Sequence, residues 1–225
     1  MNIEPIAYIR NDFTEKCGIP RQAGLSEVES LVVFEPKYRD SSALRGIEGF
    51  SHLWLIWGFS EAKQSGWSPT VRPPRLGGNK RLGVFATRSP FRPNSLGLSC
   101  VELVGLVELG AEGVALSVLG ADIKNGTPVY DVKPYLSYSD SRPDARGGFT
   151  DTAESLSVEV SITDALLERI PPAKRSPLLS VLRNDPRPTY QSDPEREYGM
   201  EFGGMNVKFR VSGGILTVTD IERTK

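Results

Sequence analysis

The segment 67–99 is rich in arginine, proline and glycine and contains no Asp or Glu. Two of its arginines, Arg88 and Arg92, stand four residues apart, each beside serine or proline residues that favour turns. Guanidinium groups held in this way can bind a carboxylate or a phosphate through paired hydrogen bonds. The alternative is that both arginines bind carbonyl groups of their own turns.

The charge of the chain is unevenly distributed. Residues 62–101 hold seven Lys or Arg and no acid, whereas the rest of the chain holds 20 basic and 28 acidic residues. The formal net charge of −1 hides this difference. A cationic segment on a near-neutral chain predicts an anionic partner, either a polyanion or a phosphorylated or carboxylated ligand. A solvated loop with scattered arginines is the alternative.

A second candidate site is the sequence GADIKNGTPVYDVKPYL at residues 120–136. Asn125-Gly126 is a tight-turn dipeptide, and Asp122 precedes it. Main-chain groups on such a turn can bind the edge of an adenine, and a carboxylate can accept hydrogen bonds from ribose hydroxyls. From spacing alone, a plain hairpin turn explains the pattern equally well.

A third candidate is NDPRPTYQ at residues 184–191. Two prolines flank Arg187, with Asp185 before it and Tyr190 after it. A rigid element that presents a cation, a carboxylate and an aromatic ring suits an unstacked base beside a phosphate. The alternative is a proline-rich helix exit.

Composition argues against several other chemistries. The single histidine, His52, lies in the apolar run FSHLWLIWGF, and no G-x-S-x-G motif supports a hydrolase. No ligand spacing typical of zinc, no P-loop and no G-x-G-x-x-G is present, so neither a metal nor an ordinary nucleotide fold is expected. Cys17 and Cys100 are isolated thiols, which favours a reducing cytoplasmic location. No apolar run is long enough to predict a membrane span.

Short strands must position most of these residues. Apolar runs bounded by turn residues predict strands at 3–10, 29–35, 51–60, 82–87, 96–108, 113–119 and 127–136. The first contains a proline and fits an edge strand, while residues 40–50 fit a short helix capped by Ser41 or Ser42. This number of short strands predicts a closed β-barrel or a compact sandwich.

The composition changes after residue 136. Residues 137–152 are polar and predict a linker, and helices are expected at 163–170 and 174–183, separated by Pro171-Pro172. Strands are expected at 205–211 and 214–221, with Gly213-Gly214 as the hairpin turn. The tail therefore reads as a small α+β unit, and we expect domains at 1–140 and 153–225.

Five strings of this chain, taken in order, resemble the TsaA-like family, whose characterised members are the tRNA methyltransferases known as TrmO. They are PRQAGL, RGIEGFSHLWLIWGFSE, RPPRLGGNKRLGVFATRSPFRPNSLGLS, GADIKNGTPVYDVKPYL and NDPRPTY. The strings are long and irregular and span nearly the whole chain. The resemblance implies a mainly β fold, an N-terminal closed β-barrel with a small C-terminal α+β domain, and a homodimer that binds S-adenosylmethionine (SAM) on the barrel.

The resemblance also implies which residues contact the cofactor. These are Pro20, Arg21, Gln22, Arg88, Leu98, Asp122, Ile123, Lys124 and Asn125, with Ser60 and Glu61 assigned by position. The implied reaction is methylation of N6 of threonylcarbamoyladenosine at position 37 of a threonine tRNA. Asp185 and Tyr190 are both candidates to accept the N6 proton, and Arg187 would face the substrate.

The arginine-rich segment then has two expected roles. Arg88 and Arg92 would lie in the pocket and hold carboxylates, whereas Arg72, Arg75, Lys80 and Arg81 would contact phosphates of the anticodon loop. Two rival interpretations remain. One is a non-catalytic barrel that binds SAM or RNA, and the other is a SAM-dependent methyltransferase with a different acceptor.

Overall fold

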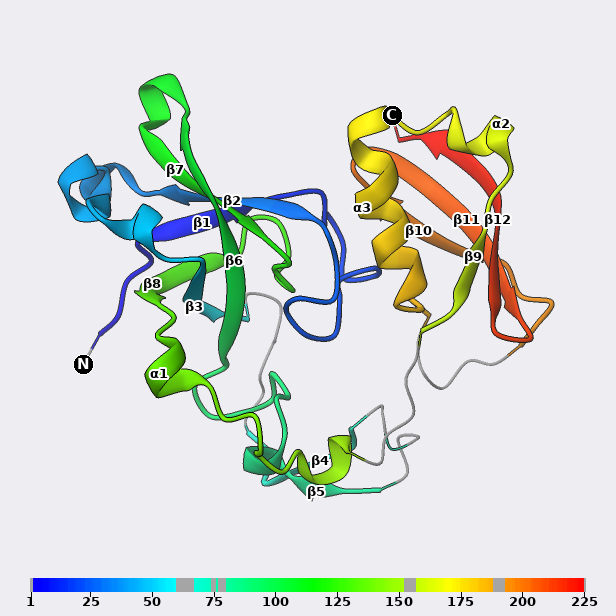
Figure 1. Ribbon diagram of the computed structural model, residues 1–225. Coiled ribbons are helices and arrows are strands. Elements are labelled where there is room, and N and C mark those ends of the chain that lie inside the picture. Colours follow the sequence, from blue (N-terminus) through cyan, green and yellow to red (C-terminus); the bar gives the residue numbers. More distant parts are fainter. Residues whose placement is uncertain are drawn as a thin grey trace.

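The structure is a computed structural model that describes residues 2–59, 67–73, 76, 80–151, 157–187 and 193–224. Four expected site residues, Ser60, Glu61, Arg75 and Tyr190, lie outside the described residues. In Figure 1 the strands of the N-terminal part gather on one side, and helix α3 (Pro172–Arg183) lies with the C-terminal sheet on the other.

Six antiparallel strands form the first part. They are β1 (Ala7–Arg10), β2 (Glu29–Phe34), β3 (His52–Gly58), β6 (Leu96–Glu108), β7 (Val114–Leu119) and β8 (Pro128–Pro134). Their order is β1-β2-β7-β6-β3-β8, and β8 pairs back with β1 through Ala7 and Val129, which closes the barrel. The mainly β fold predicted from the sequence is confirmed.

Alternation along the strands fills the barrel interior. In β1 the side chains of Ala7 and Ile9 are buried while their neighbours are exposed. In β3, Leu53, Leu55 and Trp57 are buried in the same alternating pattern. Because side chains on a strand point to opposite faces in turn, one face of each strand supplies the core.

Two local predictions for the barrel are wrong. The strand expected at 3–10 is not an edge strand, because β1 pairs with β2 on one side and β8 on the other; Pro5 lies before the strand. The helix expected at 40–50 is replaced by two short 3-10 turns, Ser41–Leu44 and Ile47–Gly49. Gly46 between them has φ +87°, which a right-handed helix cannot contain.

A small hairpin lies outside the barrel. It consists of β4 (Thr70–Val71) and β5 (Leu82–Gly83). The strand expected at 82–87 is therefore only two residues long, and a 3-10 turn, Val84–Ala86, follows it. Both the N–H and the hydroxyl of Thr87 bond to the Val84 carbonyl, at 3.1 and 2.8 Å, which closes that turn.

A second sheet and the helices α2 and α3 complete the chain. The sheet has the order β10-β11-β12-β9. Its strands are β9 (Glu159–Ser161), β10 (Tyr198–Phe202), β11 (Met205–Ser212) and β12 (Ile215–Arg223). The helices are α2 (Asp164–Leu167) and α3 (Pro172–Arg183), after the single-turn α1 (Ser137–Asp140) in the polar segment.

Local signals predicted this second unit well, apart from two strands. Gly213 and Gly214 have φ of +57° and +80°, as expected for the hairpin between β11 and β12. Thr163 caps α2, although that helix is shorter than expected, and α3 begins at Pro172. Strands β9 and β10 were not predicted.

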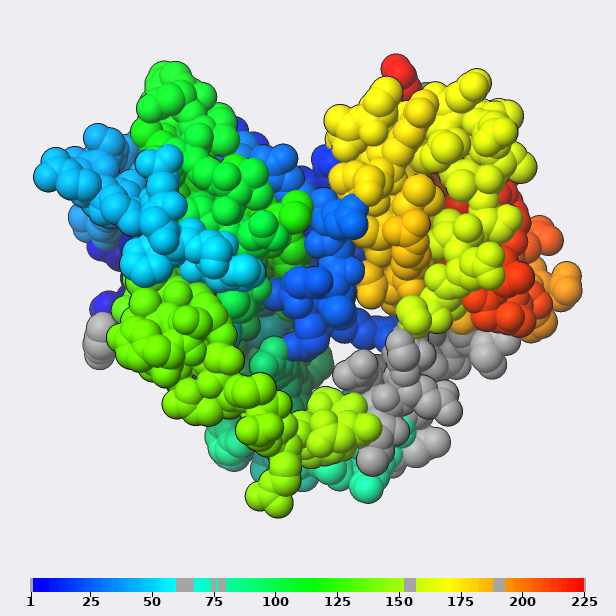
Figure 2. Space-filling model, in the orientation of Figure 1, coloured from blue at the N-terminus to red at the C-terminus, as the bar shows by residue number. Residues whose placement is uncertain are grey.

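The segment between β1 and β2 joins the two units. Phe13 and Val28 belong to the hydrophobic core under the second sheet, not to the barrel core. Lys174 of α3 forms an ion pair with Asp12 at 2.8 Å, and the Glu27 N–H donates to Ser180 at 2.9 Å. Figure 2 shows this part of the chain, in blue, between the two lobes.

Candidate functional site

Asp122 lies between β7 and β8 at one end of the barrel. Its carboxylate accepts a hydrogen bond from the Ser99 hydroxyl at 2.5 Å, and that hydroxyl accepts the Trp57 indole N–H at 2.9 Å. Trp57 and Ser99 are buried, on β3 and β6 respectively. A Cβ at Gly97 would clash with the Trp57 ring, so this glycine leaves room for the indole. The barrel therefore fixes the orientation of the Asp122 carboxylate.

The loop 20–25 meets the Asp122 segment at the main chain. The Gly24 N–H donates to the Gly120 carbonyl at 2.8 Å, and a Cβ at Gly120 would lie 3.2 Å from the Gly24 Cα. The main chain at Ala23 hydrogen-bonds the Asp122 carboxylate. The glycine at 120 thus permits an approach that a side chain would crowd, and both glycines have positive φ, +79° and +80°, which side chains rarely adopt.

Arg88 joins this cluster from the arginine-rich segment. Its guanidinium donates to the side-chain oxygen of Gln22, and the Gln22 amide donates to the Arg21 carbonyl at 2.5 Å. Burial raises the pKa of Asp122 above its ordinary value, while the Ser99 hydrogen bond and the positive charge of Arg88 partly offset that rise. Arg88 itself is exposed. The cluster combines a desolvated carboxylate with an accessible cation.

Arg92 and Arg88 make different hydrogen bonds. The Arg92 guanidinium donates to the Thr87 carbonyl at 3.0 Å, within its own loop. This is the structural role that the sequence left open as an alternative for both arginines. Of the expected pair, only Arg88 reaches the loop 20–25.

The remaining expected cofactor residues contribute in different ways. The Ile123 side chain is fully buried in the barrel core, and Pro20 is buried as well, so only their main chains can face a ligand. The side-chain oxygen of Asn125 accepts the Asn11 N–H at 3.1 Å. Lys124 is partly exposed, and Leu98 is 54% exposed on β6. The turn at Asn125 is therefore tied to the segment that leads to loop 20–25.

The tail supplies a tightly paired carboxylate. Asp185 is 7% exposed and receives two hydrogen bonds from the Arg187 guanidinium, both at 2.8 Å. The hydrogen bond that the guanidinium donates to Asp185 also raises the pKa of Arg187. Arg21 donates to the Asp185 carbonyl at 3.4 Å, so the tail touches the loop 20–25. The two expected tail residues in the described part of the chain thus bind each other.

The cations expected to contact RNA are all at the surface where they are described. Arg72, Lys80 and Arg81 are exposed, and Arg81 donates to the Thr70 hydroxyl at 2.8 Å across the β4–β5 hairpin. These residues flank the two strands of the β4–β5 hairpin, outside the barrel, and are not part of the Asp122 cluster.

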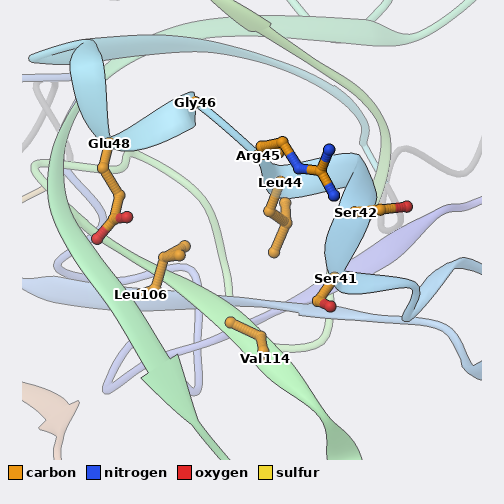
Figure 3. Close-up of a pocket in the computed structure, with 8 residues that line it drawn as sticks. All are labelled: Ser41, Ser42, Leu44, Arg45, Gly46, Glu48, Leu106 and Val114. Carbon is orange, nitrogen blue, oxygen red and sulfur yellow. The ribbon is translucent and has the colours of Figure 1, made fainter.

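Two surface cavities lie elsewhere. One, of about 330 Å³, lies between the 3-10 turns of residues 41–49 and strands β6 and β7, with Leu106 and Val114 on its floor (Figure 3). The other, of about 450 Å³, is lined by residues of β10 and the chain terminus, including Met200 and Thr224. The candidate site is therefore defined by the converging side chains around Asp122 and by neither cavity.

Within the described ranges, no group of three or more His, Cys, Asp or Glu residues has the arrangement of a metal site. No helix among those residues is long and apolar enough to cross a membrane.

Sequence reasoning missed the residues that orient the cluster. Trp57 and Ser99 were seen only as parts of strands, and Gly24 and Gly120 only as parts of motifs. The register of β3 on β6, which pairs Trp57 with Gly97, brings the indole close to Ser99. No spacing pattern in the sequence reports such a pairing.

Comparisons with known proteins show the family of the chain. The family described as "tRNA-methyltransferase O N-terminal domain" matches residues 8–141, and the "TrmO C-terminal domain" matches residues 155–224. The tRNA (adenine(37)-N6)-methyltransferase of Escherichia coli is 42% identical over 97% of both chains. The crystal structure of TrmO from Pseudomonas aeruginosa superposes with a TM-score of 0.78 at 32% identity, covering 99% of this chain and 98% of that one.

A shorter relative is named for cofactor binding. The "Probable S-adenosyl-L-methionine-binding protein" of Methanothermobacter thermautotrophicus is 36% identical over 63% of this chain and 94% of its own length.

Proposed function

Because the chain belongs to the tRNA-methyltransferase O family, we propose that it is a SAM-dependent methyltransferase that acts on N6 of the adenine at position 37 of a tRNA. The observation that carries the proposal is the convergence of Gln22, Arg88 and Asp122, from three separate segments, at one end of the barrel. This cluster is the site that we assign to the cofactor.

The donor set around Asp122 fits SAM. A partly buried carboxylate that is oriented by a neutral hydroxyl can accept hydrogen bonds from ribose hydroxyls. An exposed guanidinium, Arg88, suits the methionine carboxylate, and the exposed Leu98 offers an apolar surface. Main-chain groups of Pro20, Ile123, Lys124 and Asn125 complete the set that we assign to the cofactor, with Ser60 and Glu61 assigned by family resemblance.

SAM, when bound, supplies a methyl group that its sulfonium has already activated. The task left to the protein is to hold the acceptor nitrogen in line and to remove its proton. We assign Asp122 and Arg88 to holding the cofactor. For the proton, Tyr190 is the better candidate, because protonation of Asp185 would break its paired hydrogen bonds with Arg187. We therefore assign Asp185 and Arg187 to positioning the tail.

We further propose the specific substrate that the resemblance implies, threonylcarbamoyladenosine at position 37 of a threonine tRNA. Its carboxylate requires a cation, and we assign Arg92 to it from the sequence, since Arg88 is already assigned to the methionine carboxylate; one Arg92 nitrogen donates to the Thr87 carbonyl. Arg72, Lys80 and Arg81 are exposed and suited to anticodon-loop phosphates, and Arg75 is assigned with them from the sequence. A cytoplasmic homodimer, with domains at 1–140 and 153–225, completes the proposal.

The test is methyl transfer from labelled SAM to tRNA purified from cells with and without the threonylcarbamoyl modification. We expect label in the modified tRNA, at adenine 37, and at most trace label in the unmodified tRNA. SAM binding without transfer to any tRNA would favour the non-catalytic interpretation. Equal labelling of both tRNAs would show that the modification is not required.

A further inference from the structure

Two aromatic rings stack on each other at the surface of the arginine-rich segment. The ring centroids of Trp67 and Phe85 are 6.3 Å apart with an interplanar angle of 26°. Both are largely solvent-exposed, Trp67 at 53% and Phe85 at 71%. Exposed aromatic rings of this size are unusual on a surface unless a partner covers them.

The β4–β5 hairpin fixes the position of this pair. Trp67 lies just before β4, and Phe85 lies in the turn just after β5. Thr70 pairs with Gly83, and the Val84 N–H extends the ladder to the Pro69 carbonyl at 2.9 Å. Val84 is 1% exposed and anchors the turn that carries Phe85. The backbone that carries the two rings is therefore ordered by its own hydrogen bonds.

The charge around the pair is of one sign along the chain. Arg81 is held on the same hairpin by its bond to Thr70, Arg72 and Lys80 flank it, and residues 67–99 contain no acid. Cations beside an aromatic face match the phosphates and the base of a single-stranded nucleotide. A partner protein of ordinary composition would not need this one-sided charge.

We propose that Trp67 and Phe85 form a stacking platform for an unpaired base of the tRNA anticodon loop, with the flanking arginines on its phosphates. The inference rests on the proposed function, because it names a contact with the same RNA substrate. Phe85 lies three residues before Arg88, whose guanidinium reaches Gln22, so the platform adjoins the cofactor loops in the chain. The platform holds the neighbouring nucleotide while the target adenine enters the site.

The test compares Trp67→Leu and Phe85→Leu with Tyr138→Leu, a change at another exposed aromatic outside this segment. The probe is a synthetic anticodon stem–loop RNA with adenine at position 37, and binding is measured at several salt concentrations. Loss of one stacked base is expected to weaken RNA binding about tenfold. The control should bind as the unaltered protein does, and SAM affinity should be unchanged in all three variants.

The salt dependence separates stacking from charge. Trp67→Leu should leave the slope of log affinity against log salt unchanged, whereas Arg81→Ala should make it shallower by roughly 0.7. Trp67→Phe retains a ring and should restore most of the affinity. Its folding is verified by SAM binding.

Three outcomes would overturn the platform. Unaltered RNA affinity in both leucine variants, with methyl transfer intact in the parent protein, removes it while the proposed function stands. A change of oligomeric state in Trp67→Leu, measured by light scattering, would assign the rings to a contact between two copies of the chain. Failure of Trp67→Phe to restore RNA affinity while it binds SAM normally would exclude ring stacking. Absence of methyl transfer in the parent protein would instead count against the proposed function.

Discussion

Asp122 and Asp185 are both substantially buried, yet their partners differ in kind. Asp122 is bonded by the neutral hydroxyl of Ser99 and by main-chain groups, with the cation Arg88 at the surface nearby. The carboxylate of Asp185 accepts hydrogen bonds from two guanidinium nitrogens of Arg187. Charge-assisted paired hydrogen bonds satisfy a carboxylate far more completely than a single hydroxyl does. The first carboxylate remains available to a ligand, and the second is used within the tail.

The largest effect expected from this difference is on stability at the tail. Arg187→Met should lower the free energy of unfolding by about 3 kcal/mol, because it leaves the carboxylate of Asp185 buried without a counter-charge. Denaturant unfolding of the full chain measures this. Arg183→Met, at an exposed arginine four residues earlier at the end of α3, is the matched control and should cost well under 1 kcal/mol.

Two further variants show whether the Asp185 pair has the structural role. The double variant Asp185→Asn with Arg187→Met should recover part of the lost stability, because no unpaired charge remains. If Asp185→Asn alone abolished methyl transfer while leaving unfolding unchanged, Asp185 would be the proton acceptor after all. If Asp185 instead has a structural role, methyl transfer and stability should fall together in Asp185→Asn.

The next effect is on cofactor binding at Asp122. Asp122→Asn should weaken SAM binding about tenfold to a hundredfold, since an amide accepts ribose hydrogen bonds less well than a charged carboxylate. Isothermal titration calorimetry measures the dissociation constant. Asp131→Asn, at a half-exposed aspartate of β8 paired with Lys133, is the control and should bind SAM normally.

The raised pKa of Asp122 gives this prediction a pH dependence. The carboxylate must be ionised to accept hydrogen bonds from the ribose hydroxyls, so SAM affinity should fall as the pH falls through the raised pKa, at a higher pH than for an ordinary aspartate.

The effect of the raised pKa on the stability of the ligand-free protein has the opposite sign. A raised folded-state pKa stabilises the fold at low pH, and this contribution is lost as the pH rises through it. Asp122→Asn should therefore not lower the melting temperature of the ligand-free protein at neutral pH, and a clear fall would contradict this account.

The sequence predicted what depends on neighbours in the chain. Strand periodicity located β6 and β7, Gly213-Gly214 marked the last hairpin, and the proline pair set the start of α3. The resemblance pointed to Gln22, Arg88 and Asp122, which the structure brings together. The helix prediction for residues 40–50 was wrong because Gly46 takes a left-handed conformation inside a pattern that otherwise suits a helix.

What could not be predicted depends on contacts across the sheet. Trp57 and Ser99 are 42 residues apart and meet only because of the register of β3 on β6. Arg88 and Arg92 have similar neighbours in the sequence, yet one binds Gln22 and the other its own loop. Local residue type does not decide between these orientations, because the nearest acceptor is set by how the loop packs.

The smallest expected effect comes from removing Ser99, the neutral hydrogen-bond partner of Asp122. Ser99→Ala removes the hydrogen bond that lowers the pKa of Asp122, so that pKa should rise further. SAM affinity should then begin to fall at a higher pH than in the parent protein. At neutral pH the loss should be about threefold to tenfold, which corresponds to roughly 1 kcal/mol for one hydrogen bond. Calorimetric titrations at several pH values measure both quantities.

The barrel offers a close control for this last change. Ser117 of β7 is as buried as Ser99 and likewise donates to a carboxylate, Glu29, at 2.5 Å. Ser117→Ala should cost a similar amount of stability, about 1–2 kcal/mol, without moving the pH dependence of SAM binding. If both serine variants shifted that dependence equally, the effect would come from general loosening of the barrel. A shift confined to Ser99→Ala would show that a neutral partner keeps Asp122 charged and available to a ligand. The carboxylate of Asp185, by contrast, is already bound by Arg187 and is not available.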